Sequence, residues 1–366
     1  MRMRKLVAGS ARSVAVPLLV AGAIGGIAAT VPAGARITSP QASVFSTVSG
    51  ILSGVAASSA GNAWAVGYSG PGIDSKTLIV RRTGRTWKRV PSPAPGIRSD
   101  LCGVAAVSVR RAWAVGYADF TAGSRVLVLS WNGVAWRRAA IPRPARDGVL
   151  HGVAATSARD AWAVGDAYAL RAPKPLILHW SGTAWKRVPS PVPGLGGVLE
   201  GVAATAANNA WAVGYSISTG NTLIMHWNGS AWRVQPSPAY QGGSMLLGVA
   251  AASASDAWAV GQTNKGKTLI LHWTGATWTR VASPTPGGQS ALDAVAEISA
   301  RSAWAVGNTG SGKTLILGWN GTTWTQVTSP SPRPGSGLYG VTATSSRNAW
   351  AVGENLIERW NGATWR

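Results

Sequence analysis

The sequence predicts an all-β protein, a seven-bladed β-propeller with four antiparallel strands in each blade. A Trp-rich repeat recurs every 46 to 49 residues, which is typical of a propeller or a solenoid. Only 13% of the residues are charged, while 46 are Gly and 20 are Trp, a composition that favours strands and tight turns. Seven segments share Ala-Trp-Ala-Val-Gly, and their tryptophans are Trp64, Trp113, Trp162, Trp211, Trp258, Trp304 and Trp350.

Each repeat divides into four expected strands, shown here for the fourth copy. The first strand covers Leu199–Ala204 and the second Ala210–Gly214; the third covers Thr222–Trp227 and the fourth Ala231–Val234. Third strands are apolar on both faces, as expected for a sheet that is packed on both sides. No stretch of the repeat has helical periodicity.

Asn228-Gly229 predicts a two-residue type I′ turn between the third and fourth strands, because that turn needs positive φ at both positions. With such a turn, Trp227 pairs with Ser230 and Met225 pairs with Trp232. Trp227, Met225 and Trp232 then share one face of the sheet.

The tryptophans follow the repeat closely. Seven copies with three Trp each would need one more than the 20 present, and Arg82 occupies the missing position. We therefore expect the tryptophans to be wedges between neighbouring blades and not a set of stacking sites for a ligand.

The two ends of the chain predict how the ring closes. The seventh copy stops at Trp365-Arg366, where other copies continue into Arg-Val-x-Ser-Pro. Arg36-Ile37-Thr38-Ser39-Pro40 supplies a matching end. We predict a propeller domain over residues 36–366, closed by its N-terminal segment, which completes the last blade and leaves no free edge.

Residues 1–35 predict a cleaved signal peptide. Met1–Lys5 is basic, Val14–Thr30 is an uncharged apolar run, and Ala33-Gly34-Ala35 offers the small residues of a cleavage site. An uncleaved membrane anchor is the alternative, because the apolar run is nearly long enough to span a bilayer. The protein is therefore expected to be secreted, with possible retention at the cell surface as a second outcome.

The charge predicts attraction to polyanions. The formal net charge is +22, and subtracting Arg2, Arg4, Lys5 and Arg12 leaves +18 for residues 36–366. An anionic cell-envelope polymer or a glycan fits this charge, whereas nucleic acid is not favoured because exposed aromatics do not alternate with the basic residues. We expect a monomer. The basic residues follow the fourth strands, where charge discourages edge-to-edge aggregation: Lys88, Arg89, Arg137, Arg138, Lys186, Arg187, Arg233 and Arg280.

Several patterns are better explained by the repeat than by cofactor chemistry. Gly261–Thr268 and Gly307–Thr314 match a phosphate-loop pattern, but each precedes a strand where a phosphate loop needs a helix. His179, His226 and His272 occupy the same strand position in different blades, so they do not converge on one metal ion. No cofactor, metal or nucleotide is expected. The single cysteine, Cys102, excludes an internal disulfide.

Two positions vary among the copies while their neighbours hardly change. In a propeller the first strand lines the central channel, and both positions fall on the face that carries the longer loops. Variation on loops held by a rigid scaffold predicts a ligand-binding face, whereas drift at a water-filled channel mouth is the alternative. The first position, in Leu-x-Gly-Val-Ala, holds Ser53, Cys102, His151, Glu200, Leu247, Asp293 and Tyr339. The second, directly after Ala-Trp-Ala-Val-Gly, holds Tyr68, Tyr117, Asp166, Tyr215, Gln262, Asn308 and Glu354.

The repeats resemble those of the β-propeller superfamily, in particular secreted bacterial proteins with repeated Ala-Trp-Ala-Val-Gly and His-Trp-Asn-Gly-Thr-x-Trp motifs. The resemblance covers residues 36–366 and implies the propeller fold. The Gly-Gly pairs of kelch repeats, the Trp-Asp ending of WD repeats and the Asp-box of sialidase-like propellers are absent. No catalytic residue carries over from those families.

The sequence therefore predicts a non-catalytic extracellular or cell-surface binding protein, with its ligand or partner protein on the loop-bearing face. A second hypothesis is a lectin-like module in which Trp and Tyr between blades stack on sugars. A third is a lyase or hydrolase that uses Glu200, His151 and Asp293 at the channel mouth.

Overall fold

The computed structural model describes residues 48–142, 147–169, 172–330 and 335–366. The chain divides into two units, residues 1–43 and residues 44–366, and the first unit lies entirely outside the described residues. The predicted signal peptide and the predicted closing segment around Ile37 both lie outside them. Among the described residues, no helix is long and apolar enough to cross a bilayer, and the helix found there is η1 (Gly72–Asp74).

Seven antiparallel sheets follow one another along the second unit, one for each predicted blade. Blade 1 contains β1 (Ile51–Ser59), β2 (Asn62–Ser69), β3 (Lys76–Thr83) and β4 (Thr86–Arg89). Blade 2 contains β5 (Arg98–Ser108), β6 (Arg111–Phe120), β7 (Gly123–Trp131) and β8 (Trp136–Arg138). Blade 3 contains β9 (Gly148–Ser157), β10 (Asp160–Ala169), β11 (Ala172–Trp180) and β12 (Trp185–Val188).

The remaining blades have shorter third strands. Blade 4 contains β13 (Gly197–Ala206), β14 (Asn209–Ser216), β15 (Thr222–Trp227) and β16 (Trp232–Gln235). Blade 5 contains β17 (Ser244–Ser253), β18 (Asp256–Thr263), β19 (Thr268–Trp273) and β20 (Trp278–Val281). Blade 6 contains β21 (Ser290–Ser299), β22 (Ser302–Thr309), β23 (Thr314–Trp319) and β24 (Trp324–Val327). Blade 7 contains β25 (Leu338–Ser345), β26 (Asn348–Gly353) and β27 (Leu356–Trp360).

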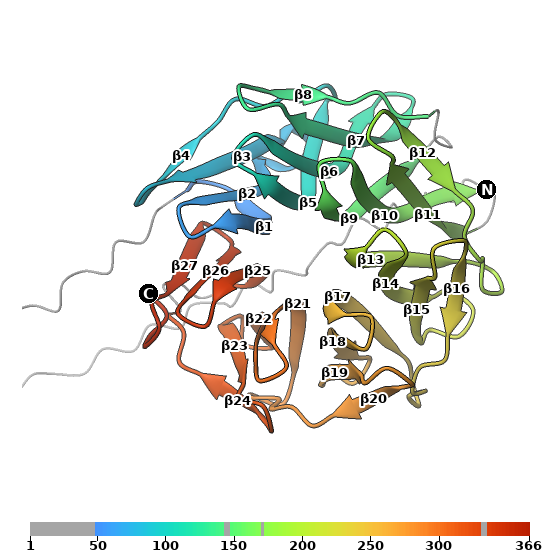
Figure 1. Cartoon of the computed structure of the whole chain (residues 1–366), viewed down its shortest axis with the longest axis vertical. Coiled ribbons are helices and arrows are strands. Elements are labelled where there is room, and N and C mark those ends of the chain that lie inside the picture. Colours follow the sequence, from blue (N-terminus) through green and yellow to red (C-terminus); the bar gives the residue numbers. More distant parts are fainter. Residues whose placement is uncertain (1–47, 143–146, 170–171, 331–334) are drawn as a thin grey trace, which may run out of the picture. The chain divides into compact units, whose positions relative to one another are not determined.

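The sheets form a closed ring, which confirms the predicted seven-bladed propeller (Figure 1). The first strand of each blade is innermost and contacts the first strand of the next, and β25 contacts β1 to complete the circle. One face carries the turns between second and third strands and the connections to the next blade; we call it the loop face. The opposite face carries the remaining short turns, and we call it the turn face.

Blade 7 has three full strands, and its outer edge is short. Trp365 forms an isolated bridge with Trp360, and Arg366 exchanges two backbone hydrogen bonds with Arg359. In the described residues, the ring is closed by direct contacts between blade 1 and blade 7. Ile51 bridges to Glu354, and Asn355 donates its backbone N–H to the Gly50 carbonyl at 2.9 Å.

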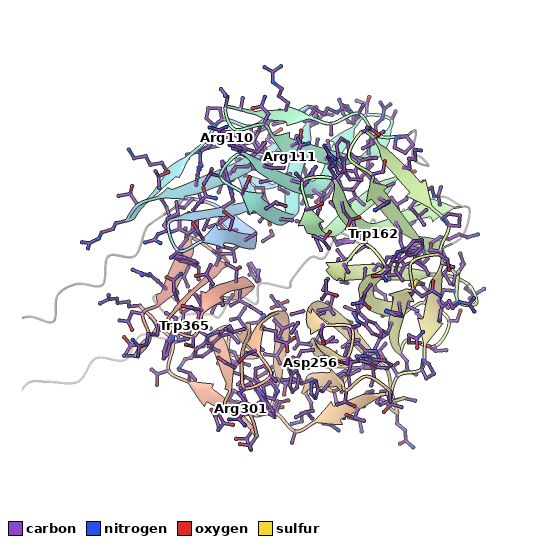
Figure 2. The ribbon with its side chains drawn as sticks, viewed as in Figure 1. Arg110, Arg111, Trp162, Asp256, Arg301 and Trp365 are labelled. Atoms are coloured by element: carbon purple, nitrogen blue, oxygen red, sulfur yellow. The ribbon has the colours of Figure 1, made fainter. Side chains whose placement is uncertain are left out.

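Tryptophan wedges separate the blades, as the sequence predicts. Figure 2 labels Trp162, which lies in blade 3. It is fully buried against two tryptophans of blade 4. Its ring centre lies 4.9 Å from that of Trp227 and 5.2 Å from that of Trp232, with the second pair edge to face. The same arrangement recurs with Trp64, Trp211, Trp258 and Trp304 as the central residue.

The predicted two-residue turn is wrong. Trp227 pairs with Trp232, and Met225 pairs with Val234, so the turn spans four residues. The Asn228 side-chain oxygen accepts the backbone N–H groups of Ser230 and Ala231, both at 3.0 Å, which stabilises the longer loop. Only Gly229 in this turn needs positive φ, at 95°. The three residues still share one face, because Trp227 and Trp232 are directly opposite each other.

Arg82 takes over the role of the missing tryptophan. In the other six blades the indole N–H at this position donates to a carbonyl of the neighbouring turn, as Trp131 does to Val109 at 3.1 Å. Arg82 donates to the equivalent carbonyl of Ala60 at 2.8 Å, and its guanidinium lies 5.0 Å from the ring centre of Trp350. Burial, followed by the charge of Arg359, lowers the pKa of Arg82.

Glu358 is another exception to the repeat. It is fully buried on β27, where the other copies carry Val80, Leu129, Leu178, Met225, Leu271 and Leu317. Its carboxyl accepts a hydrogen bond from Ser329 of blade 6, at 3.0 Å to the nearer oxygen. Burial raises its pKa to about 8, against an ordinary value of 4.5.

We expect Arg82→Trp to stabilise the protein, because a buried cation is replaced by the apolar wedge that the other blades use. The expected gain is about 1 to 2 kcal/mol in the free energy of unfolding. Arg82→Ala should lose about 2 kcal/mol, because it removes both the packing and the hydrogen bond. Denaturant unfolding of the three proteins checks this, and a less stable Arg82→Trp variant would contradict it.

We also expect stability to fall as the pH rises from about 4.5 to about 8, because folded Glu358 retains a proton that the unfolded chain has released. Glu358→Leu should remove this part of the pH dependence and add about 3 kcal/mol of stability at alkaline pH. Melting temperatures across that range provide the measurement, with Glu358→Gln as the matched neutral control. An unchanged pH profile in Glu358→Leu would show that another group is responsible.

Candidate functional site

The first varied position of the repeat lies on a β-bulge in every blade. The strand register skips one residue between Leu101 and Gly103, and it skips at the same point in the other six blades. The residue before each bulge is a fully buried leucine packed between blades, such as Leu199. We call the residues on the bulges the bulge residues: Ser53, Cys102, His151, Glu200, Leu247, Asp293 and Tyr339.

A bulge adds an unpaired residue and redirects its side chain, which is a common device beside binding sites. The bulge residues lie on the innermost strands, toward the centre of the ring. Six of them are half-exposed, whereas Asp293 is buried. The scaffold thus repeats one backbone geometry and varies only the side chain that it presents there.

The bulge also explains the invariant Gly of Ala-Trp-Ala-Val-Gly. A Cβ on Gly116 would lie 2.0 Å from the backbone oxygen of Asp100, and equivalent distances in the other blades are 1.8 to 2.0 Å. No side chain fits there without moving the backbone. The residue after this Gly is the second varied position, and we call this second set the rim residues: Tyr68, Tyr117, Asp166, Tyr215, Gln262, Asn308 and Glu354.

Blades 2 to 4 bring four predicted residues together. His151 Nε2 lies 3.0 Å from an oxygen of Asp166, and His151 Nδ1 lies 3.5 Å from an oxygen of Glu200. The Cys102 thiol is within hydrogen-bonding reach of the same imidazole. We call Cys102, His151, Asp166 and Glu200 the central cluster.

The central cluster favours the charged form of His151. Burial disfavours the imidazolium, but the charge of Glu200 and the hydrogen bonds with Asp166 and Cys102 outweigh burial and keep the pKa of His151 well above 6.5. Both ring nitrogens face a carboxylate, so neither is available as a general base. This geometry suits charge-assisted recognition better than proton transfer.

The other predicted residues are distributed around the ring. Burial and the neighbouring Glu200 charge raise the pKa of Tyr215 to about 12, so its hydroxyl stays a donor at neutral pH. In blade 6, Asp293 accepts a hydrogen bond from Asn308 at 3.1 Å. Ser53 and Leu247 take no part in the hydrogen bonds of the central cluster.

Sequence reasoning missed Arg98 and Asp100. Asp100 accepts hydrogen bonds from Ser75 at 2.5 Å, from Arg98 at 2.5 and 2.8 Å, and from Tyr117 at 2.9 Å. This buried carboxylate holds Arg98 and Tyr117 in place on the two inner strands of blade 2. Its signal in the sequence is that Asp100 is the only charged residue two positions before a bulge.

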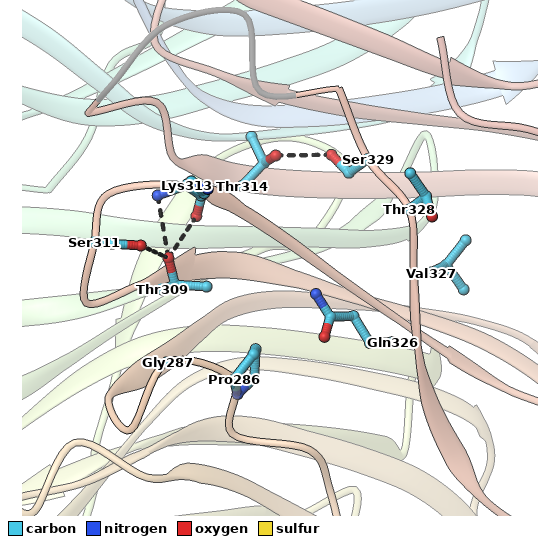
Figure 3. Close-up of a pocket in the computed structure, with 10 residues that line it drawn as sticks. All are labelled: Pro286, Gly287, Thr309, Ser311, Lys313, Thr314, Gln326, Val327, Thr328 and Ser329. Atoms are coloured by element: carbon cyan, nitrogen blue, oxygen red, sulfur yellow. Dashed lines mark hydrogen bonds between the residues drawn. The ribbon is translucent and has the colours of Figure 1, made fainter.

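The phosphate-loop patterns form ordinary turns between strands. The turn from β22 to β23 borders a cavity of about 390 Å³, lined by hydroxyl side chains and Lys313 (Figure 3). Thr309 Oγ1 accepts the backbone N–H of Lys313 at 3.2 Å, and Thr314 and Ser329 share a hydrogen bond of 2.8 Å. In blade 5 the equivalent Lys267 donates to the Gly288 carbonyl at 2.9 Å, across the loop face.

The strand histidines pair within their own blades. His179, His226 and His272 each contact the Asp or Asn that begins the neighbouring strand, at 2.6 to 2.7 Å. In the described part of the chain, no three His, Cys, Asp or Glu side chains form a group suited to a metal ion. The basic residues of the fourth strands, such as Lys186 and Arg187, are exposed on the outer strands.

The fold and these positions define a seven-bladed propeller with Trp-rich blades. No protein-family model matches the chain, and no curated protein is similar to it in sequence. Solved structures share its fold at low identity. YCF48 from Cyanidioschyzon merolae has a TM-score of 0.58 and 17% identity, covering 86% of this chain and 96% of that one.

Two further similarities come from proteins with different activities. A GH74 xyloglucanase from Xanthomonas campestris has a TM-score of 0.62 and 13% identity, covering 87% of this chain and 54% of its own, so this chain spans about half of it. A mutant of Aleuria aurantia lectin in complex with α-methyl-L-fucoside has a TM-score of 0.50 and 12% identity, covering 78% of this chain and 99% of the lectin. At these identities, the similarity shows a shared propeller fold and nothing more specific.

We expect His151 to remain protonated to a higher pH than His226 does. Burial lowers the pKa of His226, whereas the two carboxylates raise that of His151. Glu200→Gln should lower the pKa of His151, because the charge of Glu200 is the largest interaction that favours the imidazolium. An NMR titration of the imidazole signals, assigned with His151→Gln, measures both values. A His151 pKa at or below that of His226 would refute the expectation.

Proposed function

We propose that this chain is a non-catalytic extracellular binding protein whose ligand docks at the centre of the loop face. The observation that carries the proposal is the repeated bulge, which presents seven different side chains from seven equivalent backbone positions. Fixed backbone with varied side chains is the pattern expected when recognition is built on a rigid scaffold. The bulge and rim residues are the proposed contact set.

The geometry favours binding over catalysis. Both nitrogens of His151 face carboxylates, and Asp293 is hydrogen bonded to Asn308 in blade 6. A hydrolase or lyase would need an acid and a base that converge on one bond. The similar folds include one solved as YCF48 bound to D1 peptide, with a TM-score of 0.57 and 16% identity over 86% of this chain and 92% of that one.

The extracellular location in this proposal rests on the sequence of residues 1–35 and on the resemblance to secreted bacterial propellers. The exposed basic residues of the outer strands would add a less specific attraction to an anionic envelope polymer. That attraction does not involve the loop face and is expected to weaken at high salt.

Glycan binding is the second candidate, and one feature favours it. A cavity of about 270 Å³ lies between blades 4 and 5, lined by Pro236, Pro238, Trp273 and Trp278. An indole face beside a shallow cavity suits a sugar ring, as in lectins generally. This candidate places the ligand on the outer part of the ring, away from the bulge residues.

We expect His151→Gln combined with Glu200→Gln to weaken binding by about tenfold or more. The melting temperature should be unchanged, because both groups are part-exposed and are replaced together. A glycan array and a displayed peptide library would both be probed with the wild type and the double variant. Val134→Ser, on the exposed turn face of blade 2, is the matched control. A ligand that binds both proteins equally would place the site elsewhere, and loss of binding in Trp273→Phe would favour the lectin.

A further inference from the structure

Exposed apolar side chains gather on one part of the loop face. Nine large hydrophobic residues are exposed in the described part of the chain, and six of them lie on the loop-face side of blades 1 to 4, five in loops or connections and one near the end of β10. Ile73 is 76% exposed and Leu195 is 71% exposed. Exposed apolar residues that cluster in this way mark interaction surfaces. The six are Ile73, Ile97, Tyr168, Val192, Leu195 and Ile217.

Blades 5 to 7 present different loops on the same face. Their turns between second and third strands are Asn264–Lys267, Gly310–Lys313 and Glu354–Asn355, which contain no large apolar residue. The hairpins of blades 2 and 3 are also longer and project farther from the ring. Among the described residues, the exposed large apolar side chains of the loop face therefore lie on blades 1 to 4.

Hydrogen bonds of backbone and side-chain groups hold the apolar loops in place. Ile217 donates its backbone N–H to Gly196 at 3.1 Å, and Leu195 donates its own to the Ser218 hydroxyl at 2.6 Å. In blade 1, Lys76 donates to the Ile97 carbonyl at 2.6 Å. These side chains are thus presented from ordered loops, which reduces the entropy that binding would cost.

The centre of the ring next to these loops carries acidic groups, although the whole chain is strongly basic. Asp100, Asp166, Glu200 and Glu354 lie on the inner positions of blades 2, 3, 4 and 7, against two cations, Arg98 and His151. Arg98 is already paired with Asp100, and His151 with Asp166. Glu200 keeps part of its carboxylate in solvent, and Glu354 is exposed.

Tyrosines complete this half of the centre. Tyr68, Tyr117 and Tyr215 are half-buried rim residues, and burial, followed by acidic neighbours, raises the pKa of each, so all three stay neutral. Neutral aromatic rings beside carboxylates attract a cation both by charge and through the ring face. The centre therefore complements an ammonium or guanidinium group, and the rim around it complements apolar side chains.

We propose that the loop face of blades 1 to 4 binds a protein segment in which a Lys or Arg side chain enters the centre of the ring and flanking apolar side chains pack on the exposed loops. The inference rests on the proposed function and names the chemistry of its ligand. A polyanion is opposed by the acids at the centre, and a neutral sugar leaves the apolar loops uncovered. The exposed basic residues of the outer strands repel a basic partner, whereas the acidic centre attracts its Lys or Arg side chain.

Cys102 allows the charge at the centre to be measured, because it is the only cysteine in the chain and belongs to the central cluster. Its sulfur attacks a methanethiosulfonate, forming a mixed disulfide and releasing methanesulfinate. Cationic trimethylammonioethyl and anionic sulfonatoethyl reagents would be compared. The reference is a Cys102→Ser protein that carries Val134→Cys on the turn face.

We expect the ratio of cationic to anionic rates at Cys102 to exceed the reference ratio by about tenfold, and Glu200→Gln to reduce it. Any effect of His151 on thiol ionisation cancels in the ratio. If Cys102 reacts with neither reagent, Ser53→Cys in the Cys102→Ser background gives the same measurement at the neighbouring bulge. A ratio equal to the reference, or a faster anionic reagent, overturns the inference.

A displayed library of random peptides tests the partner directly. Peptides selected on the wild type should be enriched in Lys or Arg with apolar neighbours, and should bind about tenfold more weakly to Glu200→Gln and to Leu195→Ser combined with Ile217→Ser. Acidic or uncharged consensus sequences would overturn the inference, as would the absence of selected peptides. Glycans that lose affinity for the His151 and Glu200 double variant would then still support the proposed function. Peptides that bind all variants and the wild type equally would overturn both proposals.

Discussion

The close approach of the innermost strands is the constraint on which the rest of the structure depends. A Cβ placed on Gly103 would lie 3.0 Å from the backbone oxygen of His151 in the next blade, and Gly340 makes the equivalent approach to Gly54 across the closing interface. Six blades use Gly at this point, and Ala294 is the exception. The bulge beside it forces the second-strand Gly, because backbone fills the space of any side chain. Two glycines in six of the seven repeats, and one Gly and one Ala in blade 6, thus set the inner wall of the ring.

This inner geometry separates the residues that hold the scaffold from those that are free to change. Tryptophans fill the widening gap between blades farther out, where flat sheets that meet at the centre must diverge. The side chains of the bulge residues take part neither in the glycine contacts between innermost strands nor in the tryptophan contacts between blades. They can therefore vary without loss of that packing. His151, Asp166 and Glu200 use that freedom to build a charged group, and the loops of blades 1 to 4 add apolar surface beside it.

Most of the fold followed from the repeat, and part of the site did too. The seven blades, the wedges and the single exception at Arg82 were predicted from the spacing of Trp, and the structure confirms them. The turn at Asn228-Gly229 was predicted wrongly, because an Asn-Gly pair favours a short turn but the cross-blade packing of Trp227 and Trp232 favours direct pairing. Asp100 escaped notice because two of its three partners, Ser75 and Tyr117, come from a different blade and a different strand.

By itself, the sequence determined the number of blades, the face on which variation gathers and the apolar character of the interfaces, because each is a property of one repeat copied seven times. Only the tertiary structure decided that Cys102, His151 and Glu200 meet, since they are about fifty residues apart and become neighbours when the ring closes. It also decided which loops share one half of the loop face. Side-chain contacts between blades depend on the curvature of the ring, and no single repeat encodes that curvature.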